Sequence, residues 1–468
     1  MLQKTYYPLT SPQMSIWYTE KMFPGTSISN VAGTLRIQEN VDFNLLEKAI
    51  QLFIKNNDGI RLRMSLDENG SPQQYVSEYV ENPIPFIDFT VHQDSAKAFY
   101  EWNHEMTLKP FELLDQDLYS FTMVKISDSD GGIYIITHHL VSDAWNMSLS
   151  GSFIVDYYCK LKNNITEASA YLPKPSYLSF IENDMAYHHS NRYEKDKIFW
   201  EQKFDTIPDA TVLKTRKTNL ITAKSKRKAF VAPEKFTSKL KEYCLRYKVT
   251  PYPLFLSALC MYIYRVAAKE DIVLGTPILN RLNHSDKNTS GMFISTIPLR
   301  INLNAEESFY TLSERVREVC SSAYRHQRFP YEQILRYARD KHGIKENLYD
   351  IVLSYQNTKF DKSYEVDYIT RWHFNGYQPN SLTVHINDRD DEGTIIIDYD
   401  YHEDLYYDTE IDFLHQHLLN LLWHALDNPK NMICKIEMLP ESEKRKILYE
   451  FNDTEMDYPK EKLIHQLF

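Results

Sequence analysis

One segment constrains the fold more than any other, because it reads as a fully buried strand that leads directly into a long helix. Residues 132–137 (GIYIIT) are apolar almost throughout, and such strands are normally covered on both faces. Residues 145–161 follow with apolar side chains that repeat at helical spacing along one stripe. A buried strand joined to a helix by a short loop is the repeating unit of α/β folds. We therefore predict an α/β protein.

The same alternation of strand and helix patterns occurs in both halves of the chain. It predicts two related α/β lobes, residues 1–180 and 181–440, followed by a charged linker over residues 441–468. The polar stretch 182–197 is interpreted as the link between the lobes. Strands are predicted at residues 34–37, 121–126, 132–137, 271–274, 293–303, 351–355 and 394–399, and helices at 45–55, 145–161, 254–266 and 411–426.

The acidic balance of the chain limits its partners. The formal net charge is −11, which disfavours nucleic acid as the main partner because phosphate contacts require a basic face. One local basic run, residues 214–228, is interpreted as a solvated loop rather than a phosphate-binding surface.

Cysteine usage and hydropathy favour a cytoplasmic protein. The five cysteines are odd in number and form no CxxC pair, which is typical of reduced thiols. The N-terminus shows no charged region followed by an apolar stretch, so no secretory signal is predicted. The longest apolar stretch, residues 253–266, is too short to span a bilayer and is interpreted as a core helix with Thr250 as its N-cap. We expect a monomer without a membrane span.

The loop between the buried strand and its helix can carry chemistry. It reads His138-His139-Leu140-Val141-Ser142-Asp143-Ala144, and polar residues at the end of a buried strand are where α/β enzymes place reactive groups. A histidine there can act as a general base, since its usual pKa lies near neutrality. The helix N-terminus adds free backbone N–H groups for a developing negative charge.

Other chemistries are poorly supported. Adjacent histidines cannot easily share one ion and no third ligand stands at a usual spacing, so no metal is predicted. No GxSxG elbow or phosphate-cradling glycine loop occurs, and no permanently bound cofactor is expected. A second pair, His188-His189, follows no buried strand and is interpreted as a surface pair.

At this loop the sequence resembles the condensation domain family of nonribosomal peptide synthetases. The family motif HHxxxDG is matched by His138, His139 and Asp143, with Ala144 in place of glycine. Further segments resemble family motifs in the same order along the chain: LTSPQMSIW from Leu9, NDGIRLR from Asn57, GTPILNR from Gly275, GMFISTIPLR from Gly291, HQRFPYE from His326 and SYQN from Ser354.

The resemblance implies a fold and an activity. The fold is two chloramphenicol-acetyltransferase-like lobes forming a V with a central tunnel. Phosphopantetheine arms bring an acyl thioester and an aminoacyl thioester to the histidine motif, where the acceptor amine attacks the donor carbonyl. The resemblance implies that the arms, or coenzyme A, are substrates.

It also implies a role for each matched residue. His139 is the catalytic residue, as general base or as positioner of the amine, and His138 supports the loop. Asp143 is structural and pairs with Arg281 across the lobes. The Ala144 N–H is a candidate donor to the oxyanion. Ser295, Ser354 and Gln356 are further candidates from the motifs that line the tunnel.

The ends of the chain narrow the expected reaction. YPLT from Tyr7, with IWYTEK from Ile16 and PGTS from Pro24, resembles starter condensation domains of surfactin-type lipopeptide synthetases. FNDT from Phe451, Tyr458-Pro459 and IHQLF from Ile464 resemble the linker and opening of an adenylation domain. If Met1 is native, the donor cannot come from an upstream module of the same chain. The resemblance implies N-acylation of a first amino acid by a fatty acyl group from coenzyme A or an acyl carrier protein, with downstream adenylation and peptidyl carrier domains as partners.

Three alternatives stay open at this point. The chain can be an elongation domain that takes a peptidyl or aminoacyl donor from a carrier on another protein. It can be a non-catalytic domain that only docks carriers, although the intact HHxxxD disfavours this. An epimerisation domain shares the motif, but the adenylation-like tail argues against it.

Overall fold

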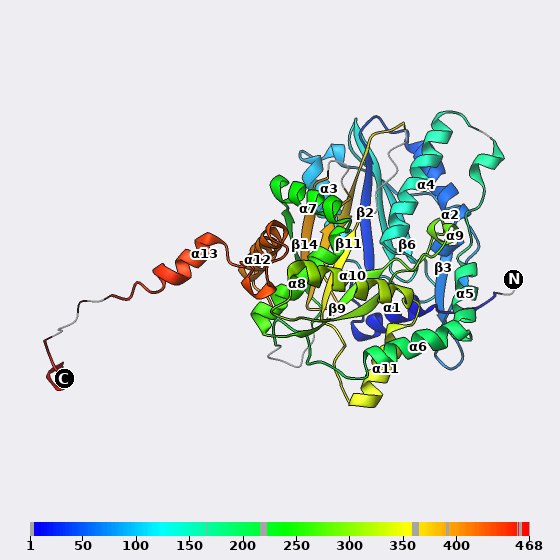
Figure 1. Cartoon of the computed structure of the whole chain (residues 1–468). Coiled ribbons are helices and arrows are strands. Elements are labelled where there is room, and N and C mark those ends of the chain that lie inside the picture. The colour runs from blue at the N-terminus through cyan, green and yellow to red at the C-terminus, as the bar shows by residue number, and fades with distance from the viewer. Residues whose placement is uncertain are drawn as a thin grey trace.

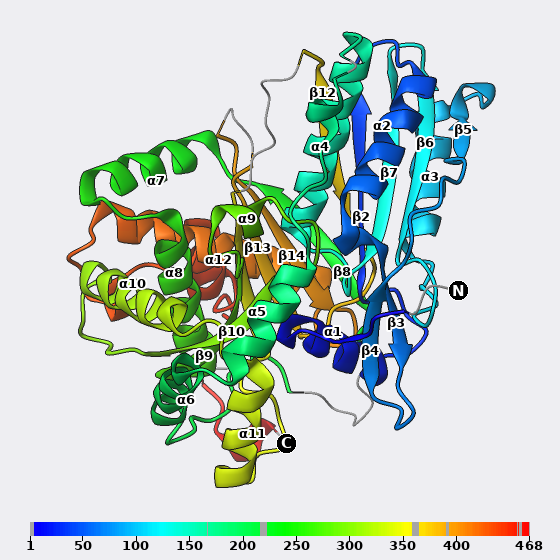
Figure 2. The same cartoon turned by 90° about the vertical axis from the view of Figure 1, so that its right-hand side faces the viewer.

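The computed structural model describes residues 4–165, 167–215, 222–357, 365–389, 393–455, 457 and 461–467. Two large β-sheets with helices packed against them form the body of the molecule (Figures 1 and 2), and the segment that carries α13 projects away from it (Figure 1). The predicted α/β class is confirmed.

The first sheet has five strands in the order β12-β2-β7-β6-β5. Four of them come from the N-terminal part of the chain: β2 (Asn30–Ile37), β5 (Phe86–Asp88), β6 (Tyr119–Ser127) and β7 (Asp130–His138). The accompanying helices are α1 (Ser11–Met22), α2 (Phe43–Asn56), α3 (Ser95–Thr107) and α4 (Ala144–Lys162), and β1 (Tyr7–Pro8), β3 (Leu62–Leu66) and β4 (Pro72–Val76) form a separate small sheet.

The central strand β7 is covered on both faces, as its composition predicts. Ile133 and Ile135 join the core under α2 and α4, whereas Tyr134 and Ile136 join a second cluster with Phe99 of α3. Alternate side chains of a strand point to opposite faces, so both layers of helices bury this one strand. That arrangement fixes where the loop after His138 emerges.

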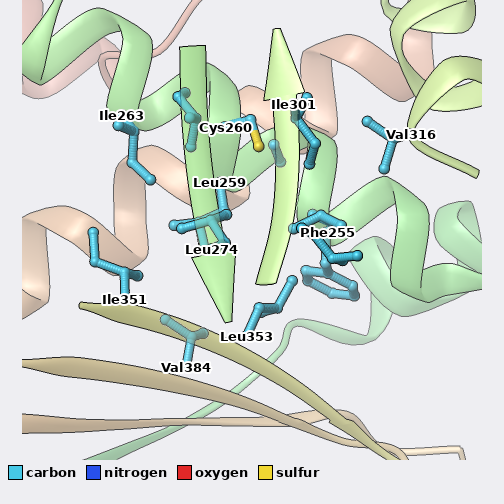
Figure 3. Packing of buried hydrophobic residues seen from close by; sticks show 14 of the residues in the cluster. Phe255, Leu259, Cys260, Ile263, Leu274, Ile301, Val316, Ile351, Leu353 and Val384 are labelled. Atoms are coloured by element: carbon cyan, nitrogen blue, oxygen red, sulfur yellow. The ribbon is translucent and has the colours of Figure 1, made fainter. Parts of the chain in front are cut away.

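The second sheet has six strands in the order β10-β9-β11-β13-β14-β8. They are β8 (Ser225–Val231), β9 (Asp271–Ile278), β10 (Ser295–Asn302), β11 (Ile351–Gln356), β13 (Leu382–Asn387) and β14 (Ile396–His402). Helices α7 (Glu234–Tyr247), α8 (Pro251–Ala267), α10 (Phe309–Arg325) and α12 (Asp408–Asp427) contribute to its core. Figure 3 shows Phe255 and Leu259 of α8 packed against Leu274 and Leu353 of the sheet. Thr250 holds the predicted N-cap position of α8, but its side chain makes no capping hydrogen bond.

One strand from the C-terminal half of the chain belongs to the first sheet. Strand β12 (Tyr368–His373) comes from the C-terminal half but pairs antiparallel with β2 of the first sheet, placing Trp372 opposite Gly33. The chain then returns to the second sheet as β13. The sheets are therefore not separated at a single point in the sequence, and the boundary at residue 180 stays a prediction.

One loop interpretation is wrong in part, and the stretch interpreted as the link between the lobes is mostly helical. Residues 182–188 lie in α5 (Leu178–His188) and residues 191–197 in α6 (Asn191–Lys203), where Tyr187 and Asp196 are buried. In the basic run, residues 225–228 belong to strand β8, where Arg227 pairs with the buried Asp400. Arg216 and Lys217 lie outside the described residues.

Four further α-helices and one π-helical turn occur among the described residues. They are α9 (His284–Lys287), α11 (Tyr331–His342), α13 (Glu441–Arg445), the π-helical turn Lys446–Glu450 and α14 (Ile464–Leu467). Tyr458, Pro459 and Phe468 of the adenylation-like tail lie outside the described residues. Among the residues described, no helix combines the length and apolarity needed to cross a bilayer.

Candidate functional site

The loop after β7 is anchored by Asp143. This residue is the N-cap of α4, where its Oδ1 accepts a hydrogen bond from the Asn146 N–H at 2.7 Å. Its other oxygen, Oδ2, accepts from the backbone N–H groups of Phe293 and Ile294 at 2.9 and 3.2 Å. One carboxylate thus starts the helix and holds a distant segment of the chain against it.

Arg281 completes this anchor, as predicted. Its Nη2 lies 3.2 and 3.3 Å from the two oxygens of Asp143, and both side chains are fully buried. The guanidinium also donates to the carbonyl oxygens of Asp286, Thr289 and Gly291 and stacks 3.9 Å from the Phe293 ring centroid. A buried ion pair is tolerated only with such additional hydrogen bonds; here both terminal nitrogens of Arg281 are bonded, whereas its buried Nε has no hydrogen-bond partner.

Further hydrogen bonds join the same two parts of the chain near Asp143 and Arg281. Ser290 Oγ donates to Asn146 Oδ1 at 2.5 Å, and the Trp145 indole N–H donates to the Lys287 carbonyl at 2.9 Å. The Tyr177 hydroxyl donates to the Met292 carbonyl oxygen. These partners had no recognisable signal in the sequence, because each interacts with a residue more than 100 positions away.

His138 faces inward and His139 occupies a more open position. His138 is buried, and its Nε2 lies 3.2 Å from Glu20 Oε1. His139 is partly buried, and its Nδ1 lies 3.3 Å from Met292 Sδ. The two adjacent imidazoles therefore have separate environments, and their roles as a supporting and a reactive histidine stay predictions.

Burial lowers the pKa of the His139 imidazole below its ordinary value. The Asp143 carboxylate acts in the opposite direction and His138 acts in the same direction as burial. A histidine with a lowered pKa is neutral at pH 7 and has a lone pair available. His139 can therefore accept a proton or a hydrogen bond from an amine.

The N–H groups of the first turn of α4 are free of helical partners by their position. Ala144 is the first residue of that helix and follows an extended Asp143 with φ −129° and ψ 177°. Such an N–H can stabilise an oxyanion placed before it. The alanine keeps this donor where the resemblance would place a glycine.

The three motif candidates lie on the second sheet. Ser295 begins β10 and lines a small cavity together with Asn280 and Glu332. Gln356 Nε2 donates to Ser354 Oγ at 3.4 Å and also contacts His385 Nδ1 at 3.1 Å. Ser354 and Gln356 thus contact each other, and the Gln356 side chain also bonds to His385 of β13 and accepts from Arg389, rather than reaching the loop of His139.

The remaining histidine and metal predictions have simple outcomes. His189 is exposed as expected, whereas His188 is partly buried, with Nε2 3.0 Å from Ser11 Oγ. Within the described part of the chain, no group of three or more His, Cys, Asp or Glu side chains is placed to hold a metal ion. The five cysteines are free thiols.

Comparison with known proteins gives consistent matches. The model of the condensation domain family matches residues 3–448. The chain is 33% identical to surfactin synthase subunit 1 of Bacillus subtilis (strain 168) over 470 residues, which are 100% of this chain and 13% of that protein. It is 31% identical to a plipastatin synthase of the same organism over 468 residues, 99% of this chain and 18% of that protein. The chain thus spans less than a fifth of the length of these relatives.

Solved structures share the fold. The starter condensation domain of rhizomide synthetase, in complex with C8-CoA, superposes with a TM-score of 0.81 at 20% identity, covering 93% of this chain and 98% of that one. The first condensation domain of the calcium-dependent antibiotic synthetase, in complex with a substrate analogue, gives a TM-score of 0.81 at 19% identity, covering 93% of this chain and 100% of that one.

Proposed function

Since the chain belongs to the condensation domain family of nonribosomal peptide synthetases, whose members form amide bonds, we propose that it N-acylates the first amino acid of a lipopeptide with a fatty acyl group. The observation that carries the proposal is the position of the His139 imidazole, which follows β7 in the loop that leads to the N-terminus of α4 and whose pKa burial lowers. Support for the starter role comes from the relatives. Identity is 33% to surfactin synthase subunit 1 and 31% to the plipastatin synthase, against 26% to gramicidin S synthase 2.

The proposed reaction forms a carbon–nitrogen bond and breaks a carbon–sulfur bond. The lone pair of the acceptor amine forms a bond to the carbonyl carbon of the acyl thioester, giving a tetrahedral oxyanion. His139 accepts a proton from the attacking nitrogen or holds that nitrogen in place, and the Ala144 N–H donates to the oxyanion. The oxyanion then re-forms the carbonyl as the carbon–sulfur bond breaks, which leaves the amide, and the departing sulfur takes the proton lost by the nitrogen and leaves as a thiol.

The other matched residues have supporting roles in this proposal. His138 holds the loop, while Asp143 and Arg281 hold the two halves of the chain together at the site. Ser295, Ser354 and Gln356 are proposed to line the path of the substrates. An α-amino group has a pKa of about 8, so about a tenth of the nucleophile is already neutral at pH 7 and the rest must lose a proton before it attacks.

The proposal also covers the partners. The acyl donor is a fatty acyl group on coenzyme A or on an acyl carrier protein, and the acceptor is an aminoacyl group on the phosphopantetheine arm of a peptidyl carrier domain. Residues 441–468 are proposed to lead into an adenylation domain. We place the protein in the cytoplasm as a monomer, with no bound metal and no nucleic-acid partner.

One experiment tests the starter role against elongation. The purified chain is offered an aminoacyl-loaded peptidyl carrier as acceptor, with either fatty acyl-CoA or a peptidyl-loaded carrier as donor. We expect mass spectrometry to detect an N-acyl aminoacyl product with fatty acyl-CoA. Turnover only with the peptidyl carrier would instead establish the elongation reaction. His139→Ala serves as the inactive control in both arms.

A further inference from the structure

Helix α1 carries a buried acid that touches the loop of the proposed active site. Glu20 is 8% exposed, and its Oε1 lies 3.2 Å from Nε2 of His138, which is 2% exposed. No other hydrogen bond of the Glu20 side chain is recorded among the described residues. A carboxylate this deeply buried is costly unless it is partnered, so the contact with His138 is its compensation.

The second nitrogen of His138 indicates which tautomer the ring adopts. Its Nδ1 lies 3.1 Å from the Leu140 backbone N–H and accepts that hydrogen bond. An accepting Nδ1 carries no proton, so the single ring proton of the neutral imidazole is on Nε2. That Nε2–H then donates to the Glu20 carboxylate, which can only accept. The edge of Phe111 packs on the same ring, with centroids 5.9 Å apart.

The same helix also holds the other side of the loop. Gln13 is fully buried, and its Nε2 donates to the Leu140 carbonyl oxygen at 2.9 Å. The Leu140 residue is thus held at its N–H by His138 and at its carbonyl by Gln13. His139 directly precedes Leu140, and its own N–H donates to the Ser29 carbonyl oxygen at 2.8 Å.

We propose that Glu20 is a positioning residue for amide formation, because it holds His138 in the Nε2–H tautomer and thereby fixes the peptide that presents His139. This inference rests on the proposed function, in which His139 is the residue that contacts the amine. Without the carboxylate, the Nδ1–H tautomer becomes accessible. That tautomer would place a proton against the Leu140 N–H and displace the loop.

The tautomer can be read without any activity. In protein labelled with 15N-histidine, long-range 1H–15N spectra distinguish a protonated ring nitrogen from an unprotonated one, and the His138 signals are assigned by their loss in His138→Asn. We expect an unprotonated Nδ1 and a protonated Nε2 in the wild type. A protonated Nδ1 in the folded wild type would overturn the inference, whether or not the chain forms amides.

Three variants complete the test. In Glu20→Leu, which fills the site but cannot accept, we expect a mixed His138 tautomer and an acylation rate lower by about 10- to 100-fold, the range for a displaced catalytic group. Glu20→Gln keeps an accepting oxygen, so it should retain the tautomer and most of the rate. An unchanged His138 tautomer in folded Glu20→Leu would overturn the inference.

Glu332→Gln is the matched control for Glu20. Glu332 is another carboxyl group that contacts α1, through a hydrogen bond from Ser15 Oγ, but it has no recorded contact with His138. We expect its substitution to leave the His138 nitrogen signals unchanged. A tautomer change in Glu332→Gln equal to that in Glu20→Leu would show a general response to loosening of α1 and would contradict the assignment to Glu20.

Discussion

Asp143 and Arg281 stand 138 positions apart in the sequence, yet Arg281 Nη2 lies 3.2 and 3.3 Å from the two carboxylate oxygens of Asp143. The pair is buried at the point where the β7–α4 loop meets residues 289–294. The Asp143 carboxylate therefore has two structural roles. It caps the helix beside His139, and it binds the opposite half of the chain.

Removing one member of this pair should destabilise the protein. Asp143→Ala leaves the Arg281 guanidinium buried without its carboxylate and frees the Phe293 and Ile294 N–H groups, for a cost of about 3–5 kcal/mol. Urea unfolding measures the loss. Exchanging Arg300, whose pair with Asp271 is partly exposed, for Ala should cost less. An Asp143→Ala protein as stable as wild type would contradict the structural role.

His139→Ala should abolish amide formation with the fold intact. The side chain is partly buried, and its recorded side-chain hydrogen-bond contact is to a thioether, so truncation removes a reactive group and little packing. Product formation followed by mass spectrometry, together with circular dichroism, checks both parts. Full activity in purified, folded His139→Ala would exclude this residue from the chemistry.

The oxyanion role of the Ala144 N–H can be tested by proline. Proline is tolerated at the first position of a helix, and the extended backbone of Asp143 suits a following proline. Ala144→Pro should therefore fold while lacking the N–H, and we expect amide formation to fall by about 100- to 1,000-fold.

Ala144→Gly is the control for this substitution. It keeps the N–H and restores the residue of the family motif, so its rate should stay close to that of wild type. If Ala144→Pro also turned over normally, the oxyanion donor would have to be another group.

His139 should titrate below its usual range. Burial lowers the pKa of this imidazole in the folded protein, whereas in the unfolded chain the pKa is about 6.5. The unfolded state thus binds the proton first as the pH falls, so the stability contributed by neutral His139 is complete above about pH 6.5 and declines below it. NMR titration of the folded protein gives the midpoint, and a value at or above 6.5 would contradict the prediction.

Replacing Gly59 by any residue with a side chain should lower the free energy of unfolding. A Cβ built at this position would lie 1.9 Å from the Ser290 carbonyl oxygen and 3.1 Å from Tyr177 Cβ, so the contact between the two halves of the chain would have to open. We expect Gly59→Ala to cost at least about 2 kcal/mol of unfolding free energy, consistent with overpacking of a close contact.

Gly70→Ala gives the comparison for Gly59. Gly70 has open space around it but a φ of +77°, so the substitution should cost only about 1 kcal/mol of backbone strain. Equal thermal shifts in the two variants would show that the Ser290 contact does not limit position 59.

The sequence alone determined the elements and the reactive loop. The apolar run of β7, the stripe of α4 and the six ordered motifs identified the α/β class and placed His138, His139 and Asp143 at a strand-to-helix junction. These are local properties, because hydrophobic periodicity and motif spacing depend on residues that are neighbours along the chain. Element ends moved by a few residues, and most of the polar stretch 182–197 is helical, with Tyr187 and Asp196 buried by contacts that its local pattern does not show.

Only the tertiary structure decided what surrounds the loop. The strand β12 crosses to the first sheet, Glu20 meets His138, and Met292 lies against His139. Each of these contacts joins residues more than 100 positions apart, and their sequences carry no local mark of the partner. The environment of His139, including the burial that lowers its pKa, arises from that packing. The motif therefore identifies the position of the reactive residue, and the tertiary structure determines its surroundings.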